Sequence, residues 1–348
     1  MKKKIISIQT VSMILGFVLL STCLMACGAV KDASEKIPES SQTNKDSSSG
    51  LVDDESSVGT GNSEESLDDE LDSLEANFMT KGDLIVANEG SDVVVLLDSD
   101  GNFKKIVYNE SNFSHTITGL SWKEDTKEVL ITVSGSGEVI AVSAIDGSSR
   151  TVISGSVLSS GVYDVVELSN GLLLVAEYST LKLFNQSGIP QSWNSPAQPR
   201  AEEVAATSDG GFVVCSSHNN TGRVEKYHVN GTSDGAFKVV NASAAYSNAN
   251  RAYGCKQLSN GKFVVSWDGS EEAIAILSED LSAEELVYQE PSILRSPRGV
   301  EEKENGNILV LDSYFHHIVE LDSDLELVRV FGDTVLNSPA QIIEVPTL

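Results

Sequence analysis

The chain has 348 residues, with 51 acidic and 24 basic side chains and a formal net charge of −27 at pH 7. Such an acidic chain repels phosphate backbones and anionic lipid, which excludes nucleic acid as a favoured partner. We expect three parts: an export signal over residues 1–26, an acidic tether over 27–79 and a folded domain over 80–348.

The first 26 residues have the composition of an export signal. Lys2–Lys4 form a basic start, and Val11–Leu20 form an apolar core that is too short for a membrane-spanning helix. The segment ends in Leu24–Cys27, which resembles the bacterial lipobox, where a leucine stands three residues before the cysteine that is cut and acylated. Leu20–Cys23 is a second candidate, and an ordinary secretory signal cleaved elsewhere is the other alternative.

The lipobox resemblance implies that Cys27 carries a diacylglyceryl thioether and an acylated amine. Each buried methylene adds roughly 0.8 kcal/mol of membrane affinity, so several acyl chains together hold a protein on a membrane. Gly28 follows the cysteine. By the same resemblance, this residue implies the outer membrane in a cell that has one, and otherwise the outer face of the plasma membrane.

Residues 31–79 contain three basic and fourteen acidic side chains and therefore have a net charge of −11. A segment this polar cannot bury enough apolar surface to fold. We expect residues 27–79 to be a disordered tether that holds the folded domain away from the bilayer.

A pattern of about 45 residues recurs six times from Asp83 to the C-terminus. Its apolar second strands lie at residues 84–87, 130–133, 173–176, 212–215, 263–266 and 308–311. In four copies an Asx-Gly turn precedes this strand, as tight hairpins require. Four short strands at this period are typical of a β-propeller blade. The sequence therefore predicts an all-β fold, a six-bladed β-propeller.

The first copy has no strand before Asp83 that could serve as its innermost strand. Pro339–Val345, at the other end of the chain, matches Pro297–Val300 and its neighbours. We expect the C-terminal segment to supply the innermost strand of the first blade. This arrangement closes the ring and removes an open sheet edge.

Two cysteines remain in the folded domain. Cys215 and Cys255 align with core positions of other copies, such as Ala176 and Val165, so we predict two buried thiols. One disulfide between them is the alternative in an exported chain.

The last copy resembles an NHL repeat. The matching segments are Pro297–Val300, Asn305–Asp312, His317–Asp322 and Val328–Gly332. The other copies share the spacing and turns but not this consensus, so the resemblance covers residues 80–348 as architecture only. Its six-bladed relatives include NHL proteins, gluconolactonase-like or regucalcin-like hydrolases and strictosidine-synthase-like proteins, which share a fold but not a chemistry.

In such propellers, the loops between blades and the loops from second to third strands surround one end of the central channel. Aromatic, guanidinium and carboxylate groups gather there, a mixture typical of sites for sugars, peptides and protein loops. Ordinary solvated loops are the alternative. The candidate ligand-binding residues are Tyr163, Glu202, Arg251, Tyr253, Trp267, Asp268, Arg298 and Asp312.

The gluconolactonase resemblance implies a divalent ion such as Ca²⁺ or Mg²⁺ on oxygen ligands in the channel. Candidate ligands are Asp164, Glu202, Glu203, Asn220, Asp268 and Asp312. His316 and His317 alternate along an extended segment and so cannot both face one site with His218. We assign no catalytic residue, because the chain has no Gly-x-Ser-x-Gly nucleophile motif.

Arg200, Arg251 and Arg298 open or precede the first strands of three successive copies. They are expected either to surround the channel mouth and bind carboxylates or phosphates, or to form salt bridges with the many nearby acids.

Taken together, these features favour a membrane-anchored lipoprotein whose propeller is a binding or scaffold module for an envelope protein, peptide or glycan. The alternative is a divalent-metal-dependent lactonase or esterase-like hydrolase with its site in the channel. The sequence does not decide whether the protein is an enzyme.

Replacement of Cys27 by alanine tests the lipid anchor. We expect labelled palmitate to enter the wild-type protein, and the Cys27→Ala chain to take up no label and leave the membrane fraction. Cys23→Ala is the matched control and should keep both properties. Unlabelled wild-type protein with the same distribution as Cys27→Ala would contradict the anchor.

Overall fold

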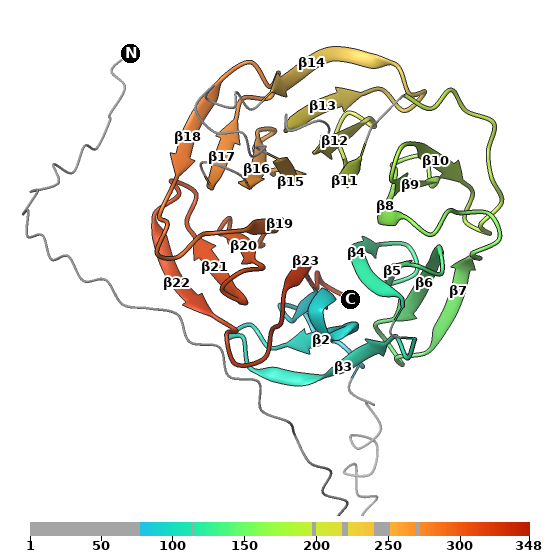
Figure 1. Ribbon diagram of the computed structural model, residues 1–348, viewed down its shortest axis with the longest axis horizontal. Helices are drawn as coiled ribbons and strands as arrows, with labels where there is room; N and C mark the ends of the chain where they lie inside the picture. The colour runs from blue at the N-terminus through green and yellow to red at the C-terminus, as the bar shows by residue number, and fades with distance from the viewer. Residues whose placement is uncertain (1–76, 113, 197–199, 218–221, 240–250, 269–271) are drawn as a thin grey trace, which may run out of the picture. The chain divides into compact units, whose positions relative to one another are not determined.

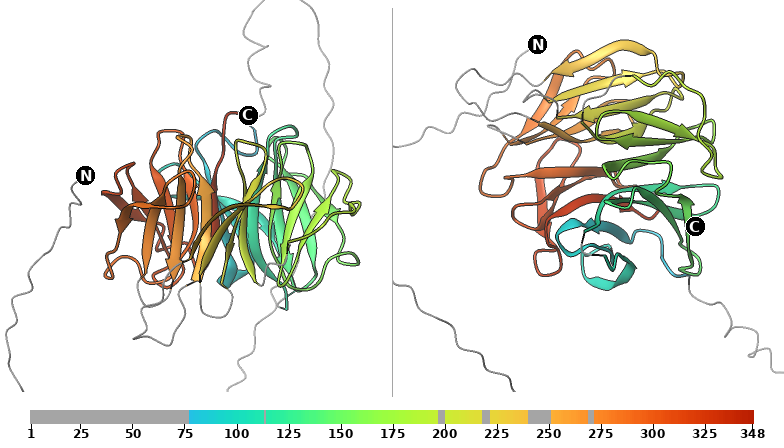
Figure 2. Two further views of the ribbon diagram at one scale, coloured as in Figure 1. Left: turned by 90° about the horizontal axis from the view of Figure 1, so that it is seen from above. Right: turned by 45° about the vertical axis from the view of Figure 1, so that its right-hand side comes forward.

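The computed structural model describes residues 77–112, 114–196, 200–217, 222–239, 251–268 and 272–348. Within these residues, six antiparallel sheets form a ring of blades (Figure 1), which confirms the expected all-β, six-bladed propeller. Figure 2 shows the ring from the side, with the strands running along its axis. The export signal, Cys27, most of the tether and residues 218–220 lie outside the described residues.

Each blade places its first strand nearest the axis (Figure 1). Blade 1 consists of β23 (Pro339–Glu344), β1 (Leu84–Asn88), β2 (Val93–Leu97) and β3 (Phe103–Asn109). Blade 2 consists of β4 (Thr116–Lys123), β5 (Glu128–Ser134), β6 (Glu138–Ser143) and β7 (Ser149–Ile153). Blade 3 consists of β8 (Val162–Glu167), β9 (Leu173–Glu177) and β10 (Leu181–Phe184).

The other three blades have four strands each. Blade 4 consists of β11 (Ala201–Ala206), β12 (Phe212–Ser216), β13 (Arg223–Tyr227) and β14 (Ser233–Val239). Blade 5 consists of β15 (Arg251–Gln257), β16 (Phe263–Asp268), β17 (Ala273–Leu277) and β18 (Glu284–Tyr288). Blade 6 consists of β19 (Pro297–Glu302), β20 (Ile308–Asp312), β21 (His317–Leu321) and β22 (Leu327–Phe331).

The two ends of the folded domain share one sheet, as expected. β23 pairs antiparallel with β1, so that Val86 lies opposite Ile342 and Leu84 opposite Glu344. Beyond the strand, the Val345 amide donates to the Asp83 carbonyl at 2.8 Å. The ring is therefore closed by backbone hydrogen bonds between segments more than 250 residues apart.

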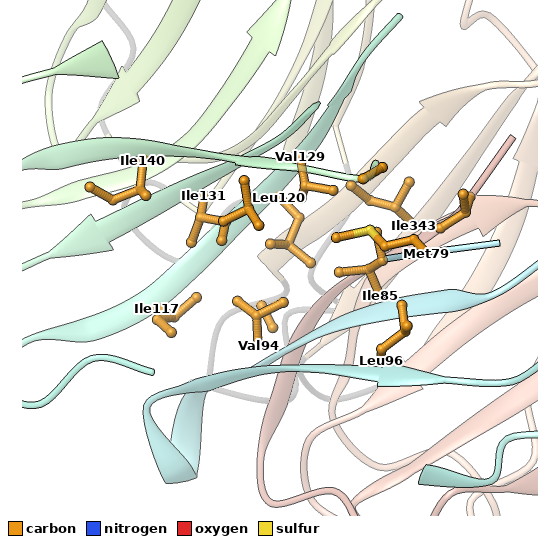
Figure 3. Close-up of a cluster of buried hydrophobic side chains, with 14 of the residues drawn as sticks. Met79, Ile85, Val94, Leu96, Ile117, Leu120, Val129, Ile131, Ile140 and Ile343 are labelled. Atoms are coloured by element: carbon orange, nitrogen blue, oxygen red, sulfur yellow. The ribbon is translucent and has the colours of Figure 1, made fainter. Parts of the chain in front are cut away.

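Apolar side chains of the first three strands of each blade fill the wedges between neighbouring blades. Figure 3 shows the wedge between blades 1 and 2, where Ile85 and Val94 meet Ile117 and Ile131. Met79 belongs to this cluster and is fully buried. The packed domain therefore begins by Phe78, whose amide donates to the Ile145 carbonyl at 2.8 Å, slightly before the expected start at residue 80.

Blade 3 lacks the expected fourth strand within the described residues. The segment after β10 makes one isolated bridge, between Phe184 and Pro190, and the Ser195 hydroxyl accepts the Leu181 amide at 3.1 Å. Proline has no N–H to donate to a ladder, so this segment covers the edge of β10 without continuing the sheet.

The two cysteines are free buried thiols, which confirms the sequence prediction. Cys215 and Cys255 belong to the same apolar cluster between blades 4 and 5. Among the described residues, no helix is long and apolar enough to cross a membrane.

Removal of residues 339–348 tests the closure. We expect a melting temperature lower by well over 5 °C, because blade 1 loses its innermost strand and blade 2 loses a neighbour; about 1 kcal/mol corresponds to roughly 2–4 °C in a domain of this size. Circular dichroism measures the transition. Removal of only residues 347–348, which follow the strand, is the control and should lower the melting temperature far less, because it removes the packing of Leu348 but leaves β23 paired with β1. An unaltered cooperative melt in the longer deletion would contradict a closed ring.

Candidate functional site

A polar cavity of about 290 Å³ lies at the end of the channel where the first strands of the blades begin. All six blades contribute to its wall. The lining residues are Glu89, Thr118, Tyr163, Arg200, Glu202, Glu203, Arg251, Tyr253, Arg298, Gly299, Ala340 and Gln341.

A β-bulge in each first strand explains why these residues line the cavity. In β4, Ile117 pairs with Val133 and Gly119 with Thr132, which leaves Thr118 without a partner in β5. Similar register shifts occur in β8, β11, β15, β19 and β23. A bulge bends its strand and re-aims the extra side chain. The extra residues that line the cavity are Thr118, Tyr163, Glu202, Tyr253, Arg298 and Ala340.

Two arginines meet on a single tyrosine in this cavity. The Nη1 group of Arg251 donates a hydrogen bond to the Tyr253 hydroxyl at 2.8 Å. The guanidinium carbon of Arg298 lies 3.8 Å from the centre of the Tyr253 ring, which is a cation–π contact. Because Tyr253 is only 5% exposed, its ring is fixed by packing. Its contacts with the two guanidinium groups therefore position both of them.

The third arginine is neutralised by a carboxylate. Arg200 Nε lies 2.7 Å from Glu202 Oε1, and the Ser217 hydroxyl donates to the same oxygen. Within the described part of the chain, by contrast, neither Arg251 nor Arg298 has a carboxylate within 4.0 Å. Salt bridging therefore accounts for Arg200 and leaves the other two for another partner.

Two more carboxyl groups flank the arginines. Burial raises the pKa of Glu89, which the charge of Arg298 partly offsets. Burial also raises the pKa of Asp268, and the Ser296 hydroxyl donates to Asp268 Oδ2 at 2.9 Å. Glu89 was not among the predicted residues. In an alignment of the second strands it corresponds to Asp268, which was predicted, so extending the alignment to the first blade would have found it.

Just below the cavity, side chains of the first strands bond to the backbone of the next blade. Asp164 Oδ2 accepts the Val204 amide of the next blade at 2.9 Å, and Gln341 Oε1 accepts the Leu120 amide at 2.5 Å. Glu203 occupies the position in β11 that corresponds to Asp164 in β8, and it accepts the Cys255 amide of the next blade. These side chains link three neighbouring pairs of blades at the axis.

Glycine occupies the equivalent position in the other blades, because the next strand comes too close for a side chain. A Cβ on Gly119 would lie 2.6 Å from the Tyr163 carbonyl oxygen, and one on Gly254 would lie 2.5 Å from that of Arg298. Hydroxyls of the second strands make the link here: Thr132 donates to the Tyr163 carbonyl and Ser266 to the Arg298 carbonyl.

Burial raises the pKa of Asp164 to about 8. It also raises the pKa of Glu203 well above its ordinary value, and the nearby Asp164 carboxyl adds to this rise. Asp164 is therefore expected to hold its proton near neutral pH.

The structure brings five of the eight predicted residues together in the cavity, namely Tyr163, Glu202, Arg251, Tyr253 and Arg298. Asp268 lies beside them, since its charge interacts with Arg251 and Arg298. Trp267 and Asp312 are elsewhere, and their expected position on the channel face is corrected.

Trp267 and Asp312 occupy the equivalent position near the end of a second strand, where the side chain turns into the blade. Trp267 is 4% exposed and packs in the core of blade 5 with Cys255. Asp312 is fully buried and accepts the amides of Arg295 and Ser296, which ties down the loop entering β19. Both residues therefore stabilise their blades.

Asn220 lies outside the described residues, and the other proposed metal ligands are engaged in other contacts. Glu202 pairs with Arg200, Asp164 and Glu203 accept amides from the next blade, and Asp312 caps a loop. Across the described residues, no three His, Cys, Asp or Glu side chains lie close enough to hold a metal ion. His316 Nδ1 accepts the Ser338 amide, and the buried ring of His317 bonds to the Ile293 carbonyl.

Comparison with models of known protein families gives no match for this sequence. No curated protein matches it either. In structure, the chain is similar to one from a nidogen–laminin complex, with 14% identity over 75% of this chain and 97% of the other and a TM-score of 0.60. It is also similar to a protein of unknown function from Bacteroides caccae, with 15% identity over 76% and 98% and a TM-score of 0.57.

A third similar structure is a catalytically inactive virginiamycin B lyase from Staphylococcus aureus with quinupristin. It has 12% identity over 74% of this chain and 87% of the other, and the TM-score is 0.51. Identities this low show the β-propeller fold alone, and propellers with one architecture perform unrelated functions.

The buried carboxyls at the axis predict a pH dependence of stability. Asp164 keeps its proton in the folded state up to a pH of about 8, whereas the unfolded chain releases it near 4. Across that window the unfolded state binds fewer protons, so stability falls as the pH rises. Thermal melts between pH 5 and 8 should show a flatter decline in Asp164→Asn than in wild type.

Replacement of the exposed Asp333 by asparagine is the matched control and should leave the wild-type slope unchanged. Equal slopes in wild type and Asp164→Asn would mean that Asp164 is ionised in the folded protein.

Proposed function

We propose that this protein is an exported, lipid-anchored binding module, whose propeller recognises an envelope protein, peptide or glycan through the cavity at the channel mouth. The observation that carries this proposal is the set of bulges that aims one side chain from each blade into a single cavity. Mixed guanidinium, phenol and carboxylate groups at a concave site are suited to a polar ligand.

The chemistry of the cavity favours binding over hydrolysis. Carboxylates that would hold a divalent ion are already bonded to an arginine or to backbone amides. Of the two tyrosines in the wall, Tyr253 is contacted by two guanidinium groups. A hydrolase would need a nucleophile or a metal-activated water, and the mouth offers fixed hydrogen-bonding groups instead.

The anchor is part of the same proposal and rests on the basic start, the apolar core and the Leu24–Cys27 motif. A long acidic tether after Cys27 would let the propeller reach partners away from the membrane surface. The two cavity arginines that have no carboxylate partner among the described residues would attract an anionic group of a ligand to the mouth, against the repulsion from the acidic rest of the domain.

Filling the cavity tests the proposed function. Ala340→Trp places an indole among the lining residues, whereas Phe103→Trp changes an exposed residue of β3 and is the control. Solubilised envelope material should be retained by wild type and Phe103→Trp, and retention should fall at least tenfold on Ala340→Trp with an unaltered melt. Equal retention by all three proteins would contradict the mouth as the binding site.

The hydrolase alternative is tested in the same preparation. Metal analysis and a panel of lactones and esters should show no bound Ca²⁺ or Mg²⁺ and no turnover. Turnover that EDTA abolishes and Ca²⁺ or Mg²⁺ restores would replace the binding function with catalysis.

A further inference from the structure

We propose that Arg251 and Arg298 form a binding site for the terminal carboxylate of a peptide. This inference rests on the proposed function and names the ligand group that the cavity takes. It begins with the placement of the two guanidinium groups, which come from neighbouring blades and contact the same tyrosine, one at its hydroxyl and one at its ring face.

The domain contains many more acidic than basic side chains, yet none of the described carboxylates pairs with these two arginines. Residues 80–348 contain 37 acidic and 18 basic side chains. Arg150, Arg200, Arg223 and Arg329 each lie within 4.0 Å of a carboxylate. Arg251 and Arg298 are the two cavity arginines that have no such partner among the described residues.

A carboxylate is the group that satisfies such a pair. Guanidinium groups donate parallel N–H bonds to the two oxygens of a carboxylate, and these charge-assisted bonds are about twice as strong as neutral ones. Arg251 uses one Nη on Tyr253, and Arg298 directs its Nε toward Ser313 Oγ at 3.4 Å. Among the described residues, the remaining donors of both groups make no hydrogen bond, and we assign them to a ligand in the cavity.

The rest of the wall fits the end of a peptide. A terminal residue presents an amide N–H close to its carboxylate, and the carboxyl groups of Glu89 and Asp268 lie beside the arginines as acceptors for such a donor. Burial raises the pKa of both groups, which weakens their repulsion of an incoming anion. A cavity of about 290 Å³ holds one or two residues and excludes a folded surface.

An acidic sugar has the same carboxylate but fits less well. Sugar rings stack on exposed aromatic faces, and the Tyr253 ring beside the two guanidinium groups is 5% exposed with Arg298 over one face. Tyr163, the other lining tyrosine, comes from blade 3, whereas the two arginines come from blades 5 and 6. A peptide terminus needs no such platform.

The experiment uses a mixed library of N-acetylated tripeptides with free C-terminal carboxylates and the same library with C-terminal amides. Each library is passed over the immobilised chain, and the retained peptides are identified by mass spectrometry. We expect wild type to retain members of the acid library and not their amides. Arg251→Gln and Arg298→Gln should retain at least tenfold less, and Arg298→Lys an intermediate amount, because lysine keeps the charge without the planar fork.

Arg295→Gln is the matched control. Arg295 is an exposed arginine of the same blade as Arg298, and it stacks on Tyr314 outside the cavity. This variant should retain peptides as wild type does. Melting temperatures of all variants establish that they are folded. The comparison of the acid and amide libraries on wild type tests the carboxylate requirement independently of any variant.

Several outcomes would overturn the site. These are equal retention of acid and amide libraries, no retention of either by wild type, or full retention by folded Arg251→Gln and Arg298→Gln. Binding of galacturonate oligosaccharides without peptide binding would also overturn it and assign the arginines to a glycan. An envelope partner retained equally by wild type and by the double arginine variant would leave the binding function intact and remove only this carboxylate site.

Discussion

A bulge at the same level of every first strand is the constraint on which the mouth of this propeller depends. In a regular ladder, side chains alternate between the two faces of a blade. One or two extra residues interrupt that alternation, so that Tyr163 and Glu202 line the cavity while Asp164 and Glu203 reach the next blade. The cavity and the contacts between blades therefore arise from one backbone feature.

Closure of the ring completes the mouth, because the two ends of the folded domain together form blade 1. Ala340 and Gln341 enter from the C-terminal strand, and Gln341 then bonds to Leu120 in blade 2. Glu89 lies in the turn after β1, and the Asn88 side chain just before it accepts the Asn337 amide at 2.6 Å. Pairing of β23 with β1 thus positions one side of the mouth as well as stabilising the domain.

Repetition in the sequence was sufficient to predict most of the fold. The recurring apolar second strands and the Asx-Gly turns predicted the number of blades. The match between Pro339–Val345 and Pro297–Val300 predicted the closing strand. The missing fourth strand of blade 3 was not predicted, because the repeat pattern was extended to this blade although Pro190 removes a donor where the ladder ends.

The site was predicted in part, and the errors have a single cause. Residues at the start of a first strand, such as Tyr253 and Arg298, were correctly placed at the mouth by alignment of the copies. Trp267 and Asp312 were misplaced because a shift of one position at the end of a second strand turns the side chain from the channel into the blade. Because side chains alternate between the two faces of a strand, an alignment error of one residue moves a side chain to the opposite face.

The structure was also needed to identify the arginines that lack an acidic partner. In the sequence, Arg200, Arg251 and Arg298 have similar surroundings, rich in acids. Only the distances separate Arg200, which pairs with Glu202, from the two that gather on Tyr253. The distinction between a structural salt bridge and a candidate binding group therefore depends on contacts between blades.

Hydrogen exchange at the closing strand tests the central claim most directly. If β23 completes both the ring and the mouth, its amides should exchange as slowly as those of β12 in blade 4, through global unfolding. Exchange of residues 340–343 within seconds, while residues 212–216 stay protected, would mean that the ring is open and that the mouth described for it does not persist.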